Sequence, residues 1–264
     1  MAIPSIYWAQ RSARAQAALT EKSAKEVDKQ LIKYFNNAMK NVVAEFEATY
    51  NKYLLSIEKG REPTPADLYK LDKYWQMQGQ IRKELEKLGD RQHILFSNRF
   101  VEHYAGIYRA VAIKDDLFFG EIDVANAKQM INQIWCADGK TWSSRIWTNT
   151  EKLQEALNDN LINCVLTGKD STHLKKLLMD EFGVAFRRAD RIVRTELAHI
   201  QTQAARQRYL DSGVSEVEVW ADKDERRCDV CGKLHMKRFS IYEPMPVPAH
   251  SNCRCSIIPV VEVD

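Results

Sequence analysis

The feature that most constrains the fold is an uninterrupted amphipathic run from Glu21 to Glu58. The run contains no proline or glycine, and apolar residues recur in it every three or four positions, with lysine and glutamate between them. This spacing places the apolar side chains on one face of an α-helix, which is roughly 55 Å long at 1.5 Å per residue and ends at Lys59-Gly60. The apolar residues are Val27, Leu31, Tyr34, Ala38, Val42, Phe46, Tyr50, Tyr53 and Ile57.

Further start and stop signals predict that most of the remaining chain is also helical. Thr64, Pro65 and Asp67 are typical of a helix start, and Gly89 is a typical end. Asp123 is the predicted cap of a short helix that ends near Trp135. Longer helices are predicted at residues 94–111, 142–167 and 184–211, with another short helix at residues 171–183 and a linker at residues 115–120. We expect the long helices to pack against one another; the alternative is that their apolar faces bind partner subunits.

The composition is that of a folded globular protein. Hydrophobic residues make up 45% of the chain and charged residues 28%, and the net charge of +3 neither demands nor excludes nucleic acid. We expect no membrane association, because no run of about 18 apolar residues occurs. The N-terminus lacks the apolar core of a secretory signal, so we expect assembly in a cytoplasm. Clustered cysteines in that compartment are more often metal ligands than disulfides.

Five metal-ligand residues lie in two short motifs near the end of the chain. Cys228 and Cys231 form a C-x-x-C pair, and the second motif supplies His250, Cys253 and Cys255. Two such pairs joined by a loop suit the tetrahedral coordination of Zn²⁺. The motifs supply five candidates for four places, so several ligand sets remain open, and His235 is a sixth candidate. The alternative is that the cysteines hold no metal and are reduced or paired in disulfides.

The sequence changes in character after Gly213. Residues 216–220 alternate glutamate with apolar residues, as in a β-strand, and residues 257–261 are typical of an edge strand. The predicted fold class is mainly α, with long N-terminal helices and a helical body followed by a small α+β C-terminal domain with a zinc knuckle. We place the helical body at residues 1–183 and the C-terminal domain at residues 184–264, which combines helix 184–211 with the zinc-knuckle β region.

The donors suffice to fill a zinc coordination sphere, which favours a structural ion over a catalytic one. The H-x-E and H-E-x-x-H motifs of zinc enzymes, phosphate-binding glycine loops and the G-x-S-x-G elbow are all absent from the sequence. We therefore predict that the protein is not an enzyme. The rival interpretation is an H-N-H-like, metal-dependent nuclease in which His235 or His250 activates water, and its only hint is His250 with Asn252.

The helix before the knuckle carries a carboxylate on its apolar face. A buried Glu196 needs a cation or strong donors, and Arg194, Asp224 and Arg226 are the predicted partners in a structural ion network. The alternative makes Glu196 a catalytic base with His199. Three arginines on the same helix are candidate contacts to DNA phosphates, although such charged faces are more often simply solvated. They are Arg187, Arg188 and Arg191.

The C-terminal motifs, taken in order, resemble those of the phage Mu F-like head morphogenesis family, the minor capsid (minor head) proteins of tailed bacteriophages. The likeness covers roughly residues 184–260, and one departure is Leu234-His235-Met236, where the family often has Leu-Asp-Gly. The motifs are Arg191-Ile-Val-Arg-Thr-Glu196, Tyr209, Gly213-Val214, Trp220, Asp224-Glu-Arg226-Arg-Cys228-Asp-Val-Cys231, Phe239, Pro248 and His250-Ser-Asn-Cys-Arg-Cys255.

The resemblance implies a structural protein present in few copies inside the virion, within the capsid near the portal. It implies the phage portal protein as a partner, with the major capsid protein, a scaffolding protein and packaged DNA as further candidates. It also implies a role in head assembly and in DNA packaging or ejection. The rivals to this function are the nuclease and a DNA-binding module.

Overall fold

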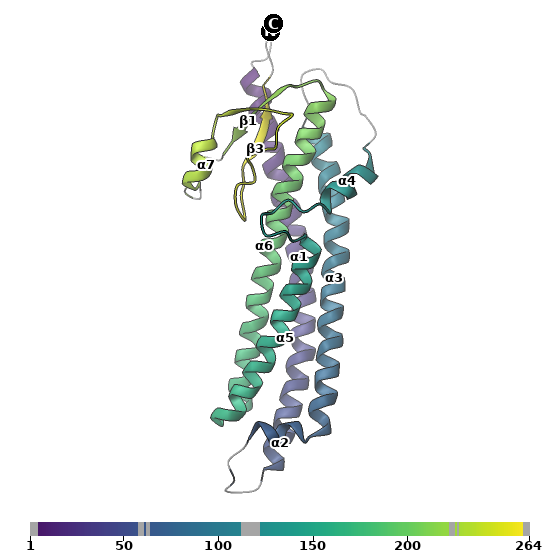
Figure 1. The fold of residues 1–264 in the computed structure, drawn as a ribbon, viewed down its shortest axis with the longest axis vertical. Helices are drawn as coiled ribbons and strands as arrows, with labels where there is room; N and C mark the ends of the chain where they lie inside the picture. The colour runs from purple at the N-terminus through teal and green to yellow at the C-terminus, as the bar shows by residue number, and fades with distance from the viewer. Residues whose placement is uncertain are drawn as a thin grey trace. The chain divides into compact units, whose positions relative to one another are not determined.

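The computed structural model describes residues 5–57, 61, 64–111, 122–221, 225 and 227–260. These residues form a mainly helical protein with one small antiparallel sheet (Figure 1), which confirms the predicted fold class. The elements are α1 (Ser5–Ser56), α2 (Pro65–Tyr69), α3 (Asp72–Ala110), α4 (Val124–Ile131), α5 (Trp142–Thr167), α6 (Ser171–Asp211), β1 (Glu216–Trp220), α7 (Asp229–Leu234), β2 (Arg238–Ser240) and β3 (Ser256–Pro259).

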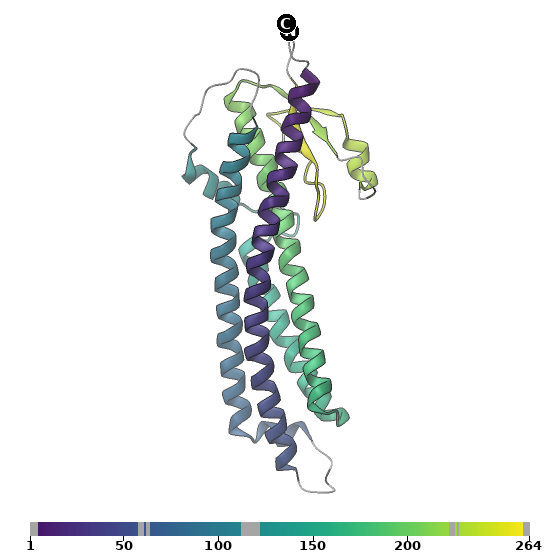
Figure 2. The same ribbon diagram turned by 180° about the vertical axis from the view of Figure 1, so that it is seen from behind.

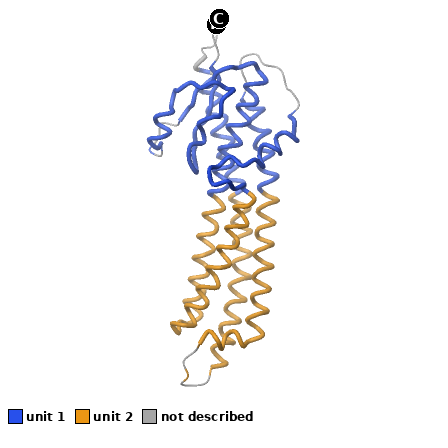
Figure 3. Tube along the Cα trace, in the orientation of Figure 1, with its two compact units in different colours: residues 1–27, 96–142, 191–264 blue, residues 28–95, 143–190 orange. Residues whose placement is uncertain are grey.

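The chain divides into two compact units, coloured in Figure 3. Unit 1 comprises Met1–Val27, Phe96–Trp142 and Arg191–Asp264, and unit 2 comprises Asp28–Leu95 and Ser143–Asp190. The helices α1, α3 and α6 each contribute to both units. The boundary predicted between residues 183 and 184 lies within α6, and the division into domains at that point stays a prediction.

Unit 2 is a helical bundle in which segments of α1, α3, α5 and α6 lie side by side (Figures 1 and 2). Aromatic residues fill much of its core. Phe35 packs edge-to-face against Phe186, with ring centroids 5.6 Å apart, and the hydroxyl of buried Tyr50 donates to the carbonyl of Cys164 at 3.2 Å. The apolar stripe of α1 is therefore covered by other helices, as expected.

Unit 1 contains the three-stranded sheet in the order β2-β1-β3. The central strand β1 pairs antiparallel with both neighbours, so β3 lies at an edge, as predicted. Buried hydrogen bonds connect β3 to the helices. Gln16 of α1 donates to the carbonyl of Ile257 at 2.8 Å, and Gln201 of α6 donates to the carbonyl of Cys255 at 3.1 Å and the hydroxyl of Ser256 at 3.0 Å. These contacts fix the segment on which the last two cysteines lie.

Several predicted helix boundaries are wrong. The first helix begins at Ser5, about four turns before Glu21, and the short helix capped by Asp123 ends at Ile131. Gly89 lies inside α3 and Gly183 lies inside α6. A glycine inside a helix costs only about 1 kcal/mol relative to alanine, which the packing of a long helix readily offsets.

Other predicted bounds and one predicted helix cap are confirmed. Trp142–Thr167 and Glu216–Trp220 have the expected bounds, and the Asp123 carboxylate accepts from the backbone N–H groups of Ala125 and Asn126. Thr64 precedes α2 as predicted, but its hydroxyl donates to Asp67 at 2.7 Å and caps no backbone group. The predicted helix end at Lys59-Gly60 and the predicted linker at residues 115–120 lie outside the described residues. None of the described helices is both long and apolar enough to span a bilayer.

Candidate metal centre

The first pair of ligand residues is positioned by the short helix α7. Cys228 is its N-cap, and the Cys228 Sγ accepts a hydrogen bond from the backbone N–H of Cys231 at 3.4 Å. One helical turn therefore brings the two sulfur atoms to the same side of α7. Cys231 is the buried residue of this helix, so α7 has little apolar contact to hold it in place.

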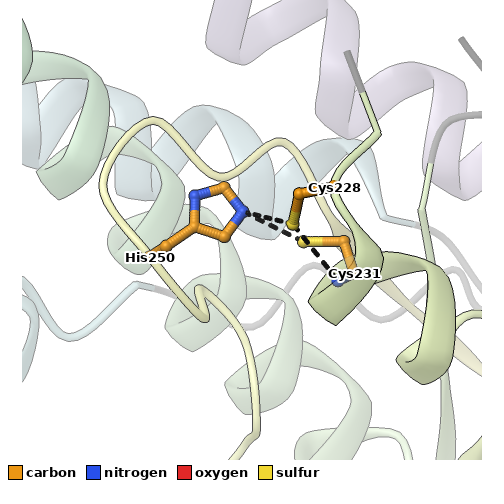
Figure 4. Close-up of side chains that lie close together, drawn as sticks. All are labelled: Cys228, Cys231 and His250. Carbon is orange, nitrogen blue, oxygen red and sulfur yellow. Dashed lines mark hydrogen bonds between the residues drawn. The ribbon is translucent and has the colours of Figure 1, made fainter. Parts of the chain in front are cut away.

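The second group of ligand residues lies on the segment that leads into β3. His250 points at the first pair (Figure 4): its Nε2 is 3.2 Å from Cys228 Sγ and 3.1 Å from Cys231 Sγ. Asn252 has a φ of 59°, in the left-handed region, and its backbone N–H donates to the Thr195 hydroxyl of α6 at 3.3 Å. This turn lets His250 and the later cysteines face the same point.

The donors form two overlapping groups that share Cys231. One is Cys228, Cys231 and His250, the other is Cys231, Cys253 and Cys255, and in each the ligand atoms lie within 4.8 Å of one another. The sulfur atoms of Cys231 and Cys253 are 3.7 Å apart. Two thiolates bound to one zinc ion at about 2.3 Å and a tetrahedral angle are about 3.8 Å apart. The geometry is therefore suited to a metal ion.

Hydrogen bonds and burial act differently on the individual thiols. The N–H of Cys231 lowers the pKa of Cys228, and the hydrogen bond with Cys255 lowers the pKa of Cys253 to about 5. That same bond raises the pKa of Cys255, whereas burial raises the pKa of Cys231 to about 12. A hydrogen bond with the Ser251 carbonyl, 2.8 Å from Nδ1, raises the pKa of His250. A bound cation would favour the thiolate form of every ligating cysteine.

The remaining candidate, His235, is in neither group of donors. Its Nδ1 accepts from the backbone N–H of Ala221 at 3.2 Å, and its ring meets Trp220 edge-to-face with centroids 5.2 Å apart. The described geometry thus gives His235 a role in packing α7 against β1.

Glu196 is buried, as its place on the apolar face of the helix implies, with 1% of its surface exposed. One partner of its carboxylate is the indole Nε1 of Trp135, which donates to it at 2.9 Å. Arg194 lies 3.8 Å from the carboxylate of Glu21. Asp224 and Arg226 lie outside the described residues, so the four-residue ion network stays a prediction. Trp135 was missed because it follows the end of α4, with no periodic signal to place it beside α6.

The candidate DNA-contacting residues Arg187, Arg188 and Arg191 all have exposed side chains on α6. Exposure is necessary for contact with phosphate groups but is also the usual state of arginine on a helix surface. Contact between these arginines and DNA stays a prediction.

Taken together, the site defines a cysteine- and histidine-rich knuckle, able to hold a metal ion, at the end of a mainly helical chain. Residues 155–258 match the family model described as "Phage Mu protein F like protein". The match covers both cysteine motifs and all of α6, and it confirms the resemblance to the phage Mu F-like head morphogenesis family that the sequence motifs indicated.

One curated relative is a longer protein whose name is that of an enzyme. Over 144 residues the chain is 25% identical to "NAD(+)--arginine ADP-ribosyltransferase EFV" of Enterococcus faecalis (strain ATCC 700802 / V583). The match covers 47% of this chain but only 29% of that relative. No solved structure matches the chain.

Proposed function

We propose that this protein is a structural minor capsid protein of a tailed phage that acts in head morphogenesis. The observation that carries the proposal is that four candidate metal ligands gather around a fifth, Cys231, within a segment that matches the phage Mu F-like family. The arrangement suits a structural ion, because the chain has enough donors to fill the coordination sphere of zinc. The likeness to an ADP-ribosyltransferase does not support enzymatic activity in this chain, because the match covers only 29% of that relative.

The bound ion would be Zn²⁺, and its role would be to attach α7 to the segment before β3. Three thiolates and an imidazole, or four thiolates, are the donor sets that structural zinc prefers. Cys231 is the buried residue of α7, so apolar burial contributes little to holding this helix. The free energy of metal binding would supply the missing stabilisation.

The helical units would provide the surface for assembly. Long helices offer extended contact area for a partner, and the proposed partner is the portal protein inside the head, with the major capsid or scaffolding protein as further candidates. The exposed arginines of α6 would contact packaged DNA. In this role the protein would act during DNA packaging or ejection.

The test is co-purification of the full chain with the portal protein of the same phage, with zinc measured on the same sample. We expect a stable complex and about one zinc ion per chain. Absence of both association and zinc would contradict the proposal. A nuclease assay with Mg²⁺ on the same preparation tests the enzyme rival, which gains support if DNA is cleaved and His250→Ala abolishes the cleavage.

The DNA contact has a test of its own. Contacts to phosphate groups displace counterions, so binding must weaken steeply as salt rises. Replacing Arg187, Arg188 and Arg191 with glutamine should remove most of that salt dependence. Association that is equally strong at low and high salt, or unchanged in the triple variant, would exclude these residues as the contact.

A further inference from the structure

A cavity of about 610 Å³ lies in unit 1 beside the metal centre. Three parts of the chain line it: α6, the end of α4 with the turn that follows it, and residues 242–251 before β3. The last of these is the loop shown in yellow beside α6 in Figure 1. Pockets of roughly 300–1,000 Å³ are typical of ligand-binding sites.

One side chain of the described lining, that of Arg206 on α6, gives the cavity a positive charge. Arg206 donates from Nε to the carbonyl of Ile241 at 2.8 Å, and its other N–H groups have no partner among the described residues. Aspartate and glutamate are absent from the described lining. Glu196 lies nearby, but it is buried and accepts from Trp135. The cavity is therefore complementary to an anionic group.

A second lining residue of α6, His199, is an uncharged polar group. Burial lowers its pKa to about 4, and its ring nitrogens make no hydrogen bond to a described residue. One face of its ring lies against Trp135, with centroids 4.2 Å apart. A neutral imidazole offers one donor and one acceptor to a ligand.

The loop that lines the cavity together with α6 has backbone N–H groups available for pairing. Prolines at positions 244, 246 and 248 alternate with Met245 and Val247. Proline fixes its own φ and restricts the preceding residue to extended conformations, so Met245 and Val247 are held extended. The backbone N–H groups of these two residues make no backbone hydrogen bond with the described part of the chain. An extended peptide can pair with such a free edge.

The alternative ligand, single-stranded nucleic acid, fits the cavity less well. Such ligands require a row of cations along the phosphate backbone and free aromatic faces on which bases stack. Arg206 is the single arginine or lysine of the described lining, and one face of Trp135 is covered by His199.

We infer that this groove binds an extended, acidic peptide segment of another protein. The peptide backbone pairs with the N–H groups of Met245 and Val247, apolar side chains pack against Trp135, and a carboxylate binds the free edge of the Arg206 guanidinium. This inference goes beyond the proposed function and requires neither zinc nor a portal partner.

The test uses the full chain and two sets of short, blocked, fluorescein-labelled peptides. Val, Ile or Leu alternates with Glu or Asp in one set and with Lys or Arg in the other, and fluorescence anisotropy measures binding. We expect members of the acidic set to bind and the basic set to bind at least tenfold more weakly. Arg206→Gln should weaken the acidic peptides about tenfold, as expected for loss of a charge-assisted hydrogen bond. The same change at exposed Arg238 on β2 should have no effect.

A second pair of variants tests the backbone contact independently of Arg206. Met245→Pro removes one N–H within a segment already rich in proline, whereas Met245→Leu keeps it, so only the proline variant should lose binding. Thermal unfolding of each variant shows whether the fold is retained. The inference is overturned if the acidic peptides fail to bind up to about 1 mM, if both sets bind equally, if Arg206→Gln has no effect in a folded protein, or if oligothymidylate binds in their place.

Discussion

The indole of Trp135 lies flat against the imidazole of His199, with ring centroids 4.2 Å apart and planes 1° from parallel. The same indole donates from Nε1 to the buried carboxylate of Glu196 at 2.9 Å. Trp135 therefore joins the turn after α4 to α6 by a stacking contact and by a hydrogen bond to a charged group.

Trp135→Phe should reduce the free energy of unfolding by about 1–3 kcal/mol, because a buried carboxylate loses a donor while an aromatic ring remains on His199. The matched control is Trp75→Phe. The Trp75 indole donates to the Tyr69 carbonyl at 3.0 Å, but its side chain is 61% exposed, so its loss should change stability by less than about 0.5 kcal/mol. Urea denaturation of both variants measures the difference, and equal effects would contradict the importance of the Glu196 contact.

A buried histidine should make the protein sensitive to acid. His103 is 3% exposed, with Ser23 Oγ 3.0 Å from Nδ1 and Thr20 Oγ1 3.3 Å from Nε2. Burial lowers its pKa to about 4, below the value of about 6.5 in an unfolded chain. Between these pH values the unfolded state binds a proton that the folded state does not, so stability is complete above pH 6.5 and falls as the pH falls toward 4.

His103→Gln should therefore flatten the pH dependence of stability. The free energy of unfolding lost by the parent protein between pH 7 and 4.5 should be smaller in the variant by about 2 kcal/mol. Denaturant titrations at several pH values measure this slope. The same substitution at exposed His173 is the control, and a slope that His103→Gln leaves unchanged would show that folding does not lower the pKa of His103.

The grouping of the cysteine and histidine donors could be predicted from the sequence, because these residues are close together in the chain. Cys228 and Cys231 are joined by one helical turn, and His250 to Cys255 occupy a single loop, so spacing alone predicted that the donors meet. Trp135 and Glu196 are 61 residues apart, and nothing local links them. The position of Glu196 on an apolar helix face predicted that its carboxylate needs a partner. The partner, the Trp135 indole, is placed there by tertiary packing, which local sequence does not indicate.

Helix ends show the same division between local and tertiary signals. The Asp123 cap was predicted because its carboxylate bonds to N–H groups two and three residues away. Gly89 and Gly183 were read as stops, since glycine is frequent after the last turn of a helix. Their propensity is a weak preference, and in α3 and α6 packing against other helices overrides it.

Loss of the residue shared by both donor groups should have the largest effect on metal binding. We expect Cys231→Ser to lower the bound zinc well below one ion per chain and to expose α7 to proteolysis, because no other side chain of α7 is buried among the described residues. Cys136→Ser, which changes a cysteine in neither donor group, should leave the metal content unchanged. Inductively coupled plasma mass spectrometry and limited proteolysis report the two effects. Full zinc occupancy in Cys231→Ser would place the ion elsewhere.

The two glycines of α3 in unit 2 should respond in opposite directions to the same substitution. A Cβ at Gly89 would lie 2.5 Å from the ring of Trp147, too close for the ring to remain where it is packed. Gly89→Ala should therefore destabilise the protein by about 1–3 kcal/mol, the usual range for overpacking, despite the better helix propensity of alanine. Gly79 has no atom within 4 Å of the position of a Cβ, so Gly79→Ala should stabilise by up to about 1 kcal/mol.

Thermal unfolding of the two alanine variants, measured side by side, tests the packing of α3 against α5. The double variant Gly89→Ala with Trp147→Leu adds a discriminating measurement, because a smaller side chain at position 147 leaves room for the new methyl group. If the clash is the cause, Gly89→Ala should be less harmful in the Trp147→Leu background than in the parent chain. A stabilising effect of Gly89→Ala alone would mean that Gly89 has no close neighbour and that α3 packs differently from the arrangement described.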